Sequence, residues 1–216
     1  MRHPLFSRLL SANVATEEVD PHSVRGGLLG PEREAVAGAG QTRVEQFTAG
    51  RVCSRIALSR LGIIKATPIP RGEDRAPIWP SGFTGSISHT DAWCAAAVAR
   101  TSDVRSIGID LEAATPLKPA LWRRVCTPGE RDWLASLADP GLSGKILFSA
   151  KESVYKCQYP ITTTFLGFHA VEVQIGDGTF EALFRQEVDG FRPGDVIHGR
   201  YLVEEGLVAS ACELAP

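Results

Sequence analysis

The order of patterned segments in this sequence predicts an α+β fold built on antiparallel sheets. A long helical segment comes first, and strand segments, two further helical segments and two hairpins over residues 171–184 and 201–211 follow it. A doubly wound parallel sheet would instead alternate single strands with helices. Because these strands follow one another across short turns, we expect antiparallel hairpins.

The first helix is predicted for residues 44–61. Thr42 and Glu45 have the spacing of a capping box at its start, and Gly62 is a typical stop. Residues 1–41 are interrupted by glycine and proline, so we predict no long element there.

The next elements are strands separated by a loop. The proline-rich residues 63–84 favour an extended path, and short strands are predicted around Ile87 and over residues 93–99. Residues 105–112 then alternate cleanly, with isoleucine and leucine on one strand face. The side chains of the other face are Gly108, Asp110 and Glu112.

Two helices follow this strand. Thr127 and Glu130 form a second capping box, with Pro128 at the first helical position. The second strong helix is predicted for residues 144–157, where apolar residues recur at helical spacing. We expect Pro160 to end it, because proline breaks the helical hydrogen-bond pattern.

Composition places the protein among ordinary folded domains. A chain of 216 residues with a hydrophobic fraction of 44% fits one large domain or two small ones. Its net charge of −2 argues against a protein built to bind nucleic acid. No stretch approaches the roughly 18 apolar residues of a membrane span. The five cysteines show no CxxC spacing, so we expect reduced thiols, no zinc site and a cytoplasmic location.

Asp110 and Glu112 are spaced for metal binding. They project from the same strand face, and their like charges repel unless a cation lies between them. Mg²⁺ prefers carboxylate oxygens and takes water and substrate phosphates as its other ligands. The pair is therefore half of a candidate magnesium site. The alternative is a solvated carboxylate pair at a strand end.

Glu152 and Lys156 lie four residues apart on the second strong helix. One interpretation is a surface ion pair worth about 0.3 kcal/mol. The other gives the metal a third carboxylate and brings an ammonium group close to a phosphate.

Ser88 and His89 are candidates for phosphate binding. Small residues and hydroxyls just before a turn can donate to phosphate oxygens, and a protonated His89 would add positive charge. A Ser–His hydrolase is the rival interpretation, but neighbours in an extended segment point to opposite sides. A polar strand end with a hydrogen-bonded His89 is the remaining alternative.

Three motifs in sequence order together resemble the 4′-phosphopantetheinyl transferases. They are GSISH at residues 85–89, SIGIDLE at 106–112 and FSAKESVYK at 148–156. The match is closer to the branch that includes the enterobactin-synthase-activating enzyme, the Sfp-like type. Residues 47–51 and 72–80 also fit the family pattern. The resemblance covers well over half of the chain, and its motifs are specific in combination and spacing.

For the fold, the resemblance implies a pseudo-dimer of two similar α/β halves with coenzyme A in the cleft between them. The halves would be residues 1–106 and residues 107–216, with the magnesium site in the second. Such an internal pseudo-dimer would make a monomer sufficient.

The resemblance also implies a metal site and catalytic groups. Asp110, Glu112 and Glu152 match the Mg²⁺ ligands of the family. Glu152 is our candidate for the base, and Lys156 is our candidate to neutralise or protonate the leaving phosphate. Tyr155 departs from the family pattern, and we expect it to affect packing alone.

Further residues match positions that contact coenzyme A in the family. Lys156 would contact a phosphate, and Ser88 and His89 match the dipeptide that touches the 3′-phosphate region. Arg51 and Arg75 match positions where the family places cations near the nucleotide.

The function that the resemblance implies is transfer of 4′-phosphopantetheine from coenzyme A to a serine of an apo carrier protein. The acceptor would be an acyl, aryl or peptidyl carrier protein, and the other product would be adenosine 3′,5′-bisphosphate. One alternative is a Mg²⁺-dependent phosphoester hydrolase, which would need no carrier protein. Another is a non-catalytic module that binds coenzyme A or a carrier protein, which would tolerate loss of one of the four charged residues.

Overall fold

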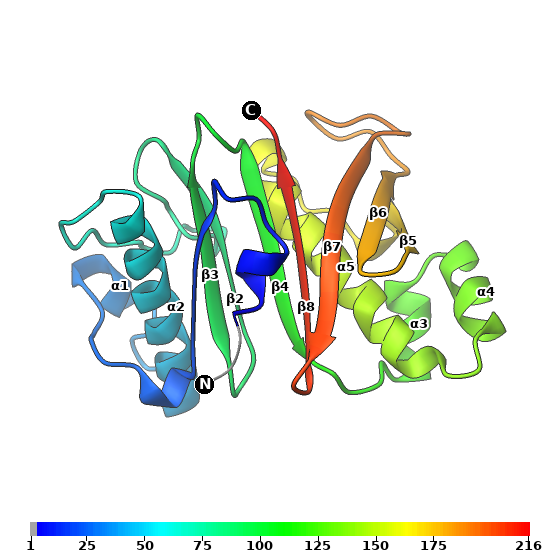
Figure 1. The fold of residues 1–216 in the computed structure, drawn as a ribbon, viewed down its shortest axis with the longest axis horizontal. Helices are drawn as coiled ribbons and strands as arrows, with labels where there is room; N and C mark the ends of the chain where they lie inside the picture. Colours follow the sequence, from blue (N-terminus) through cyan, green and yellow to red (C-terminus); the bar gives the residue numbers. More distant parts are fainter. Residues whose placement is uncertain (1–3) are drawn as a thin grey trace.

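The computed structural model describes residues 4–216 and confirms the α+β class predicted from the sequence. Two antiparallel sheets lie side by side, with helices at both ends and behind them (Figure 1). The strand orders are β1-β3-β2 and β4-β8-β7-β6-β5. The strands are β1 Ala15–Val19, β2 Phe83–His89, β3 Cys94–Arg100, β4 Ser106–Ala113, β5 Val171–Ile175, β6 Thr179–Phe184, β7 Val196–Glu204 and β8 Leu207–Leu214.

One long helix packs on each sheet. Helix α2 packs on β1 and β3 of the smaller sheet, and α5 packs on β4 and β8 of the larger one. The helices are α1 Gly30–Glu34, α2 Gln41–Arg60, α3 Pro119–Val125, α4 Pro128–Ser136 and α5 Pro140–Thr162. Short 3₁₀ helices are η1 Phe6–Arg8, η2 Pro21–Ser23 and η3 Phe168–Ala170.

The start of α2 differs from the sequence prediction. The helix begins after Gly40, and the capping box expected from Thr42 and Glu45 is not formed. The Glu45 carboxylate instead accepts a hydrogen bond from the Gln41 side chain at 2.7 Å and pairs with His22 at 3.0 Å. The capping box at Thr127 and Glu130 is confirmed, because each side chain accepts from the other residue's backbone N–H.

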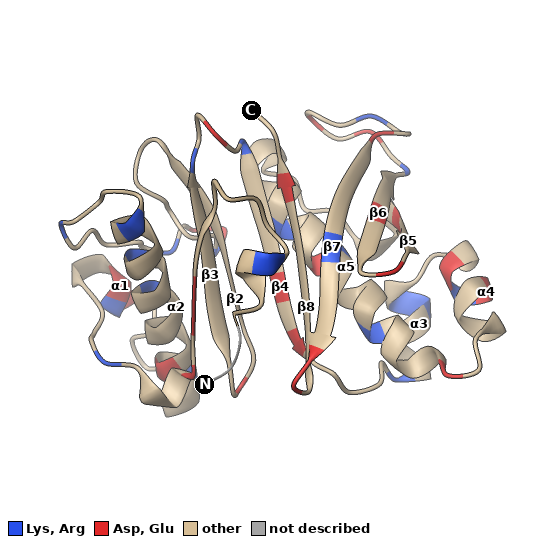
Figure 2. Ribbon diagram, viewed as in Figure 1, with Lys and Arg blue, Asp and Glu red and all other residues tan. Residues whose placement is uncertain are grey.

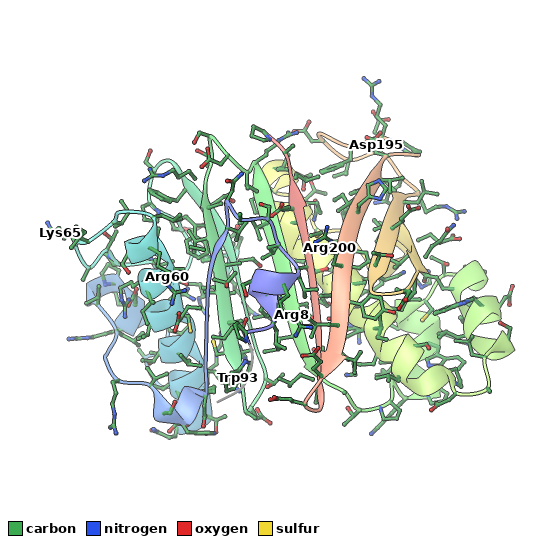
Figure 3. All side chains as sticks on the ribbon, in the orientation of Figure 1. Arg8, Arg60, Lys65, Trp93, Asp195 and Arg200 are labelled. Atoms are coloured by element: carbon green, nitrogen blue, oxygen red, sulfur yellow. The ribbon has the colours of Figure 1, made fainter. Side chains whose placement is uncertain are left out.

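The weakly patterned N-terminal residues contain a strand that the sequence did not predict. β1 pairs with β3 along its whole length, so a neighbouring strand supplies the order that its polar sequence does not. The preceding segment crosses the face of the larger sheet, where Phe6 is fully buried. Arg8 lies over β8 (Figure 3) and binds the Glu204 carboxylate at the end of β7 with two hydrogen bonds of 2.7 and 2.8 Å.

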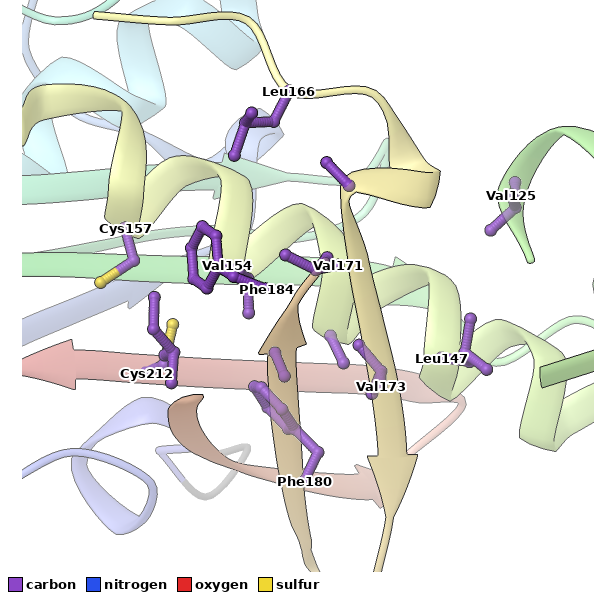
Figure 4. Close-up of a cluster of buried hydrophobic side chains, with 14 of the residues drawn as sticks. Val125, Leu147, Val154, Cys157, Leu166, Val171, Val173, Phe180, Phe184 and Cys212 are labelled. Carbon is purple, nitrogen blue, oxygen red and sulfur yellow. The ribbon is translucent and has the colours of Figure 1, made fainter. Parts of the chain in front are cut away.

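Pro160 does not end α5, contrary to the sequence prediction. The helix continues to Thr162 and ends at Thr163, which has a left-handed backbone with φ of 49°. Proline in the last turn removes one helical hydrogen bond, and the carbonyl left free is near the helix end. The predicted apolar stripe is confirmed, since Leu147, Val154 and Cys157 are buried in the cluster between α5 and the larger sheet (Figure 4).

The two predicted hairpins are confirmed as β5–β6 and β7–β8. All five cysteines are buried and free. No helix within residues 4–216 is long and apolar enough to cross a membrane.

Gly108 allows α5 to pack directly on β4. A Cβ atom at this position would lie 1.8 Å from the carbonyl oxygen of Ser153 and 2.6 Å from the backbone nitrogen of Cys157. Helix and strand backbones therefore meet at a distance that no side chain permits. The strand face predicted to carry Gly108, Asp110 and Glu112 thus faces α5, and its carboxylates reach the polar stripe of that helix.

Candidate active site

Each carboxylate of β4 pairs with a lysine from α5. The Oδ1 atom of Asp110 lies 2.7 Å from Lys156 Nζ, and the Oε2 atom of Glu112 lies 2.9 Å from Lys145 Nζ. Asp110 is 4% exposed, so the alternative of a solvated strand-end carboxylate is wrong for this residue. Acidic bands on β4 and basic bands on α5 are visible in Figure 2. Lys156 therefore forms its ion pair with Asp110. Within residues 4–216, the alternative surface ion pair between Glu152 and Lys156 is not formed.

Serine hydroxyls on β2 link the two sheets at this point. Ser86 Oγ accepts a hydrogen bond from the backbone N–H of Ile109, and Ser88 Oγ accepts one from Leu111, each at 3.1 Å. Ser88 also accepts from Lys156 Nζ at 3.0 Å and donates to Asp110 Oδ1 at 3.2 Å. The Ser88 hydroxyl is therefore buried within the carboxylate–lysine network.

His89 points away from Ser88 and contacts Arg43 of α2. The Nη1 atom of Arg43 lies 3.2 Å from His89 Nε2. Because arginine is always a donor, Nε2 accepts and the ring proton is on Nδ1. Burial, with help from the charges of Arg43 and Lys156, lowers the pKa of His89, which favours the neutral ring over the protonated ring that would add positive charge. Ser88 and His89 do not form a hydrolase dyad.

The two candidate nucleotide-binding arginines differ in accessibility. Arg51 is 6% exposed, donates from Nε to the carbonyl of Ile69 at 2.7 Å and lies over the ring of Phe47. Burial lowers its pKa to about 10. Arg75 lies in the loop before β2 with φ of 71° and lines a cavity. Arg43, exposed at the start of α2, is the cation that the structure brings to His89 and that the sequence interpretation missed.

Glu152 lies on α5 between the two lysines that pair with β4. Burial is the main cause that raises its pKa, and the charges of Asp110 and Glu112 add to this while Lys156 opposes it. The three carboxylates therefore affect one another electrostatically. They do not converge tightly, because residues 4–216 contain no group of three acidic, histidine or cysteine side chains arranged to hold a metal ion.

Two cavities flank this stretch of α5. The first, here the Tyr159 cavity, has a volume of about 480 Å³ and is lined by Arg75, Trp79, Lys156 and Tyr159 among others. It lies between the loop before β2, the strand β2 and the end of α5.

The second cavity, here the Phe165 cavity, has a volume of about 470 Å³. Its lining is mainly apolar and includes Leu121, Phe148, Glu152 and Phe165. Tyr155 lines both cavities, and the expectation that it affects packing alone stays a prediction. The side chains of Glu152, Tyr155 and Lys156 lie where the two cavities approach each other.

Comparison with known proteins agrees with these features. The family model described as the 4′-phosphopantetheinyl transferase N-terminal domain matches residues 31–99, and that of the 4′-phosphopantetheinyl transferase superfamily matches residues 106–207. The chain is 43% identical over 196 residues to 4′-phosphopantetheinyl transferase Svp of Streptomyces mobaraensis, covering 87% of this chain and 79% of the relative.

The chain belongs to the 4′-phosphopantetheinyl transferase superfamily.

Two further relatives extend this result. 4′-Phosphopantetheinyl transferase Npt of Nocardia iowensis is 35% identical over 196 residues, with 85% of this chain and 88% of the relative covered. Enterobactin synthase component D of Salmonella typhimurium is 35% identical over 150 residues, with 66% and 59% covered. The protein is thus an enzyme of the transferase class.

Two buried atoms indicate whether the residues of this transferase are suited to bind a metal ion and a phosphate. Asp110 Oδ2, an acceptor, and His89 Nδ1, a donor, are both buried and have no hydrogen-bond partner in the described part of the chain. Unsatisfied buried polar atoms are rare in folded proteins. A cation on Asp110 and an anion at His89 would satisfy both, which is the combination that a metal–phosphate group supplies. The residues therefore fit Mg²⁺ bound to a phosphorylated substrate.

Lys151, which precedes Glu152 in the KES motif, has a different role from Lys156. Its side chain is 1% exposed, and its ammonium group lies 2.8 Å from Glu130 Oε2. It also donates to the backbone carbonyls of Phe168 at 2.7 Å and Val171 at 3.0 Å. Burial lowers the pKa of Lys151, and Glu130 opposes that shift. This buried pair joins α4, α5 and η3 under the Phe165 cavity, a contact that helical spacing alone could not predict.

Proposed function

We propose that this transferase moves the 4′-phosphopantetheine group of coenzyme A to a serine of an apo carrier protein. The products are the holo carrier protein and adenosine 3′,5′-bisphosphate. The observation that carries the proposal is the pair of unsatisfied atoms, Asp110 Oδ2 and His89 Nδ1, beside the Lys156 ammonium. The relatives named as 4′-phosphopantetheinyl transferases support the same reaction.

We place the two ends of coenzyme A in the two cavities that meet at Tyr155. The Tyr159 cavity contains the cations Arg75 and Lys156 beside the flat ring of Trp79, which suits a nucleotide. The Phe165 cavity, whose lining includes Leu121, Phe148 and Phe165, suits the uncharged pantetheine arm. This placement puts the pyrophosphate between the cavities, next to Lys156.

The 3′-phosphate belongs on the α2 side of this site. His89 Nδ1 is a free donor, and Arg43 lies against the other ring nitrogen. Arg51, buried over the ring of Phe47, adds positive charge on this side of the site. Ser88 is one of the residues that bind coenzyme A, through its contact with Lys156. A bound phosphate would also raise the lowered pKa of His89, because an anion favours the protonated ring.

Asp110, Glu112 and Glu152 would hold Mg²⁺, which supplies positive charge that neutralises the pyrophosphate and the leaving phosphate. Glu152 accepts the proton of the carrier serine, directly or through a water molecule. Its raised pKa brings the carboxylate closer to the range that favours a general base at neutral pH. The serine oxygen then bonds to the phosphorus of the phosphopantetheine phosphate, and the bond from that phosphorus to the adenosine 3′,5′-bisphosphate oxygen breaks.

Lys156 neutralises or protonates the leaving phosphate oxygen. Its ammonium group is held by Asp110 at 2.7 Å and by Ser88 at 3.0 Å, so it needs little reorganisation when the charge develops. Most of the rate gain comes from this positioning and from electrostatics.

The carrier protein docks at the mouth of the Phe165 cavity, where its serine reaches Glu152. Two apolar side chains border this mouth and are unusually exposed, Leu121 on α3 at 42% and Phe165 at 79%. We further propose that the enzyme is a cytoplasmic monomer of two halves, residues 1–106 and 107–216, with coenzyme A between them. The acceptor is an acyl, aryl or peptidyl carrier protein.

The test is to incubate the protein with coenzyme A, Mg²⁺ and a panel of apo carrier proteins, and to weigh the carriers by intact mass spectrometry. We expect a phosphopantetheine-sized mass gain that EDTA abolishes. Asp110→Asn should lose the gain. Glu181→Gln should keep it, because this exposed carboxylate on β6 pairs with His198 on β7, away from the site.

Unmodified carriers together with hydrolysis of coenzyme A would support a phosphoester hydrolase instead. Binding of coenzyme A without any reaction would support a binding module. A gain that survives EDTA and Asp110→Asn would overturn the metal site but not the transfer.

A further inference from the structure

Lys145 is a charged residue at the site to which the reaction above gives no role. Its Nζ atom lies 2.9 Å from Glu112 Oε2, and its side chain is 12% exposed. The ammonium group also lies 5.5 Å from the centre of the Phe148 ring. Glu112 is 29% exposed and has Lys145 as its ion-pair partner within residues 4–216. Lys145 is therefore held in direct contact with Glu112, one of the proposed metal ligands.

The geometry of α5 places Lys145 and Lys156 on either side of Glu152. Eleven helical residues span about 16 Å, whereas Asp110 and Glu112 are about 7 Å apart along their strand. The two lysine side chains must converge to reach these carboxylates, and Glu152 lies between them on the same helix. A cation shared by the three carboxylates would approach the position of the Lys145 ammonium group.

We propose that Lys145 is an internal counter-ion that competes with Mg²⁺ for Glu112 and so sets the metal affinity of the enzyme. The inference rests on the proposed function, because it needs the metal site of Asp110, Glu112 and Glu152. A divalent ion that takes Glu112 must displace the ammonium group or share the carboxylate with it. Either event lowers the affinity, since like charges at short distance repel.

The surroundings of Lys145 favour this role over direct phosphate binding. In the described structure it lines neither the Tyr159 cavity nor the Phe165 cavity, whereas Lys156 lines the first and Lys151 the second. A phosphate in either cavity would meet those lysines before it met Lys145. The contrasting possibility is that Lys145 orients Glu112 for the metal. In that role, removal of the lysine would weaken Mg²⁺ binding instead of strengthening it.

The experiment is calorimetric titration of Mg²⁺ into the full-length protein at low salt, with and without saturating coenzyme A. The variant Lys145→Gln removes the charge and keeps much of the side-chain length, and Lys145→Arg keeps the charge. The matched control is Lys65→Gln, which removes the same charge from an exposed loop at the far end of the molecule (Figure 3). Circular dichroism melts confirm that each variant is folded.

We expect Lys145→Gln to bind Mg²⁺ about tenfold more tightly than the wild type, the effect of losing one well-placed competing charge. Lys145→Arg and Lys65→Gln should bind like the wild type. Weaker binding by Lys145→Gln, or a gain of less than about threefold, would overturn the proposal. An equal gain in Lys65→Gln would also overturn it by showing a general charge effect. If the wild type binds no Mg²⁺ in either condition, the proposed metal site fails as well.

Discussion

The close packing of α5 on β4 makes Gly108 the most sensitive position that we can identify outside the charged residues. An alanine Cβ at Gly108 would lie 1.8 Å from the Ser153 carbonyl oxygen, and real Cβ atoms essentially never approach closer than 3.0 Å. The helix must therefore retreat by about 1.2 Å, because the obstacles are backbone atoms that cannot rotate away. The Lys156–Asp110 distance of 2.7 Å would then exceed the length of a hydrogen bond.

We expect Gly108→Ala to lower the free energy of unfolding by about 3 kcal/mol, at the upper end of ordinary overpacking. The turnover of coenzyme A should fall about 100-fold, since a misplacement of this size at a catalytic site has effects of that order. The matched control is Gly144→Ala on α5, where the nearest atom would be the Leu117 Cβ at 3.4 Å. That variant should be slightly stabilised, by about 0.5 kcal/mol, because alanine favours a helix.

Urea denaturation followed by fluorescence gives the free energies, and the carrier mass assay gives the rates. If Gly108→Ala unfolds at the wild-type urea concentration and keeps its turnover, then close contact of α5 with β4 does not position the site. A variant that is destabilised yet fully active would separate packing from positioning and would refute the second part of the argument alone.

Three further predictions concern charged residues. Burial raises the pKa of Glu152, so the carboxyl group contributes stability at low pH that is lost as pH rises through its folded-state pKa. The melting temperature of Glu152→Gln should therefore exceed that of the wild type at pH 8, and by a smaller margin at pH 5. The turnover of this variant should fall at least about 100-fold. Lys151→Met leaves Glu130 buried without its ion-pair partner, and the free energy of unfolding measured by urea denaturation should fall by about 3–5 kcal/mol. The double variant Lys151→Met with Glu130→Leu should recover part of this loss. Arg43→Gln should raise the KM for coenzyme A about tenfold without changing the melting temperature, since the residue is exposed and lies against His89.

The strand that carries the proposed metal ligands could be predicted because the alternating pattern that defines it lies within its own sequence. Alternation with period two assigned Gly108, Asp110 and Glu112 to one face, and this face meets α5. The burial of Asp110 was not local information. A strand in which both faces are covered depends on what packs against it, here α5 on one side and the N-terminal segment on the other.

The missed features depend on tertiary contacts in the same way. β1 has a polar sequence and becomes a strand because β3 offers a free edge. Arg43 is one of several arginines in α2, and the packing of that helix against β2 decides that it meets His89. Lys151 and Lys156 are five residues apart, and helical geometry alone does not say which one is buried with Glu130 and which one joins Asp110.

The position of β8 has a consequence for how this enzyme becomes active during synthesis. β4 pairs along its whole length with β8, roughly a hundred residues later in the chain, and β8 in turn joins β4 to the rest of the larger sheet. Until residues 207–214 have left the ribosome, the strand bearing Asp110 has an open edge, and the two carboxylates cannot be locked against α5. Pairing over so long a separation is slow compared with helix formation. The nascent chain should therefore remain inactive, with an exposed sheet edge that chaperones can recognise, until residues 207–214 are free to pair with β4.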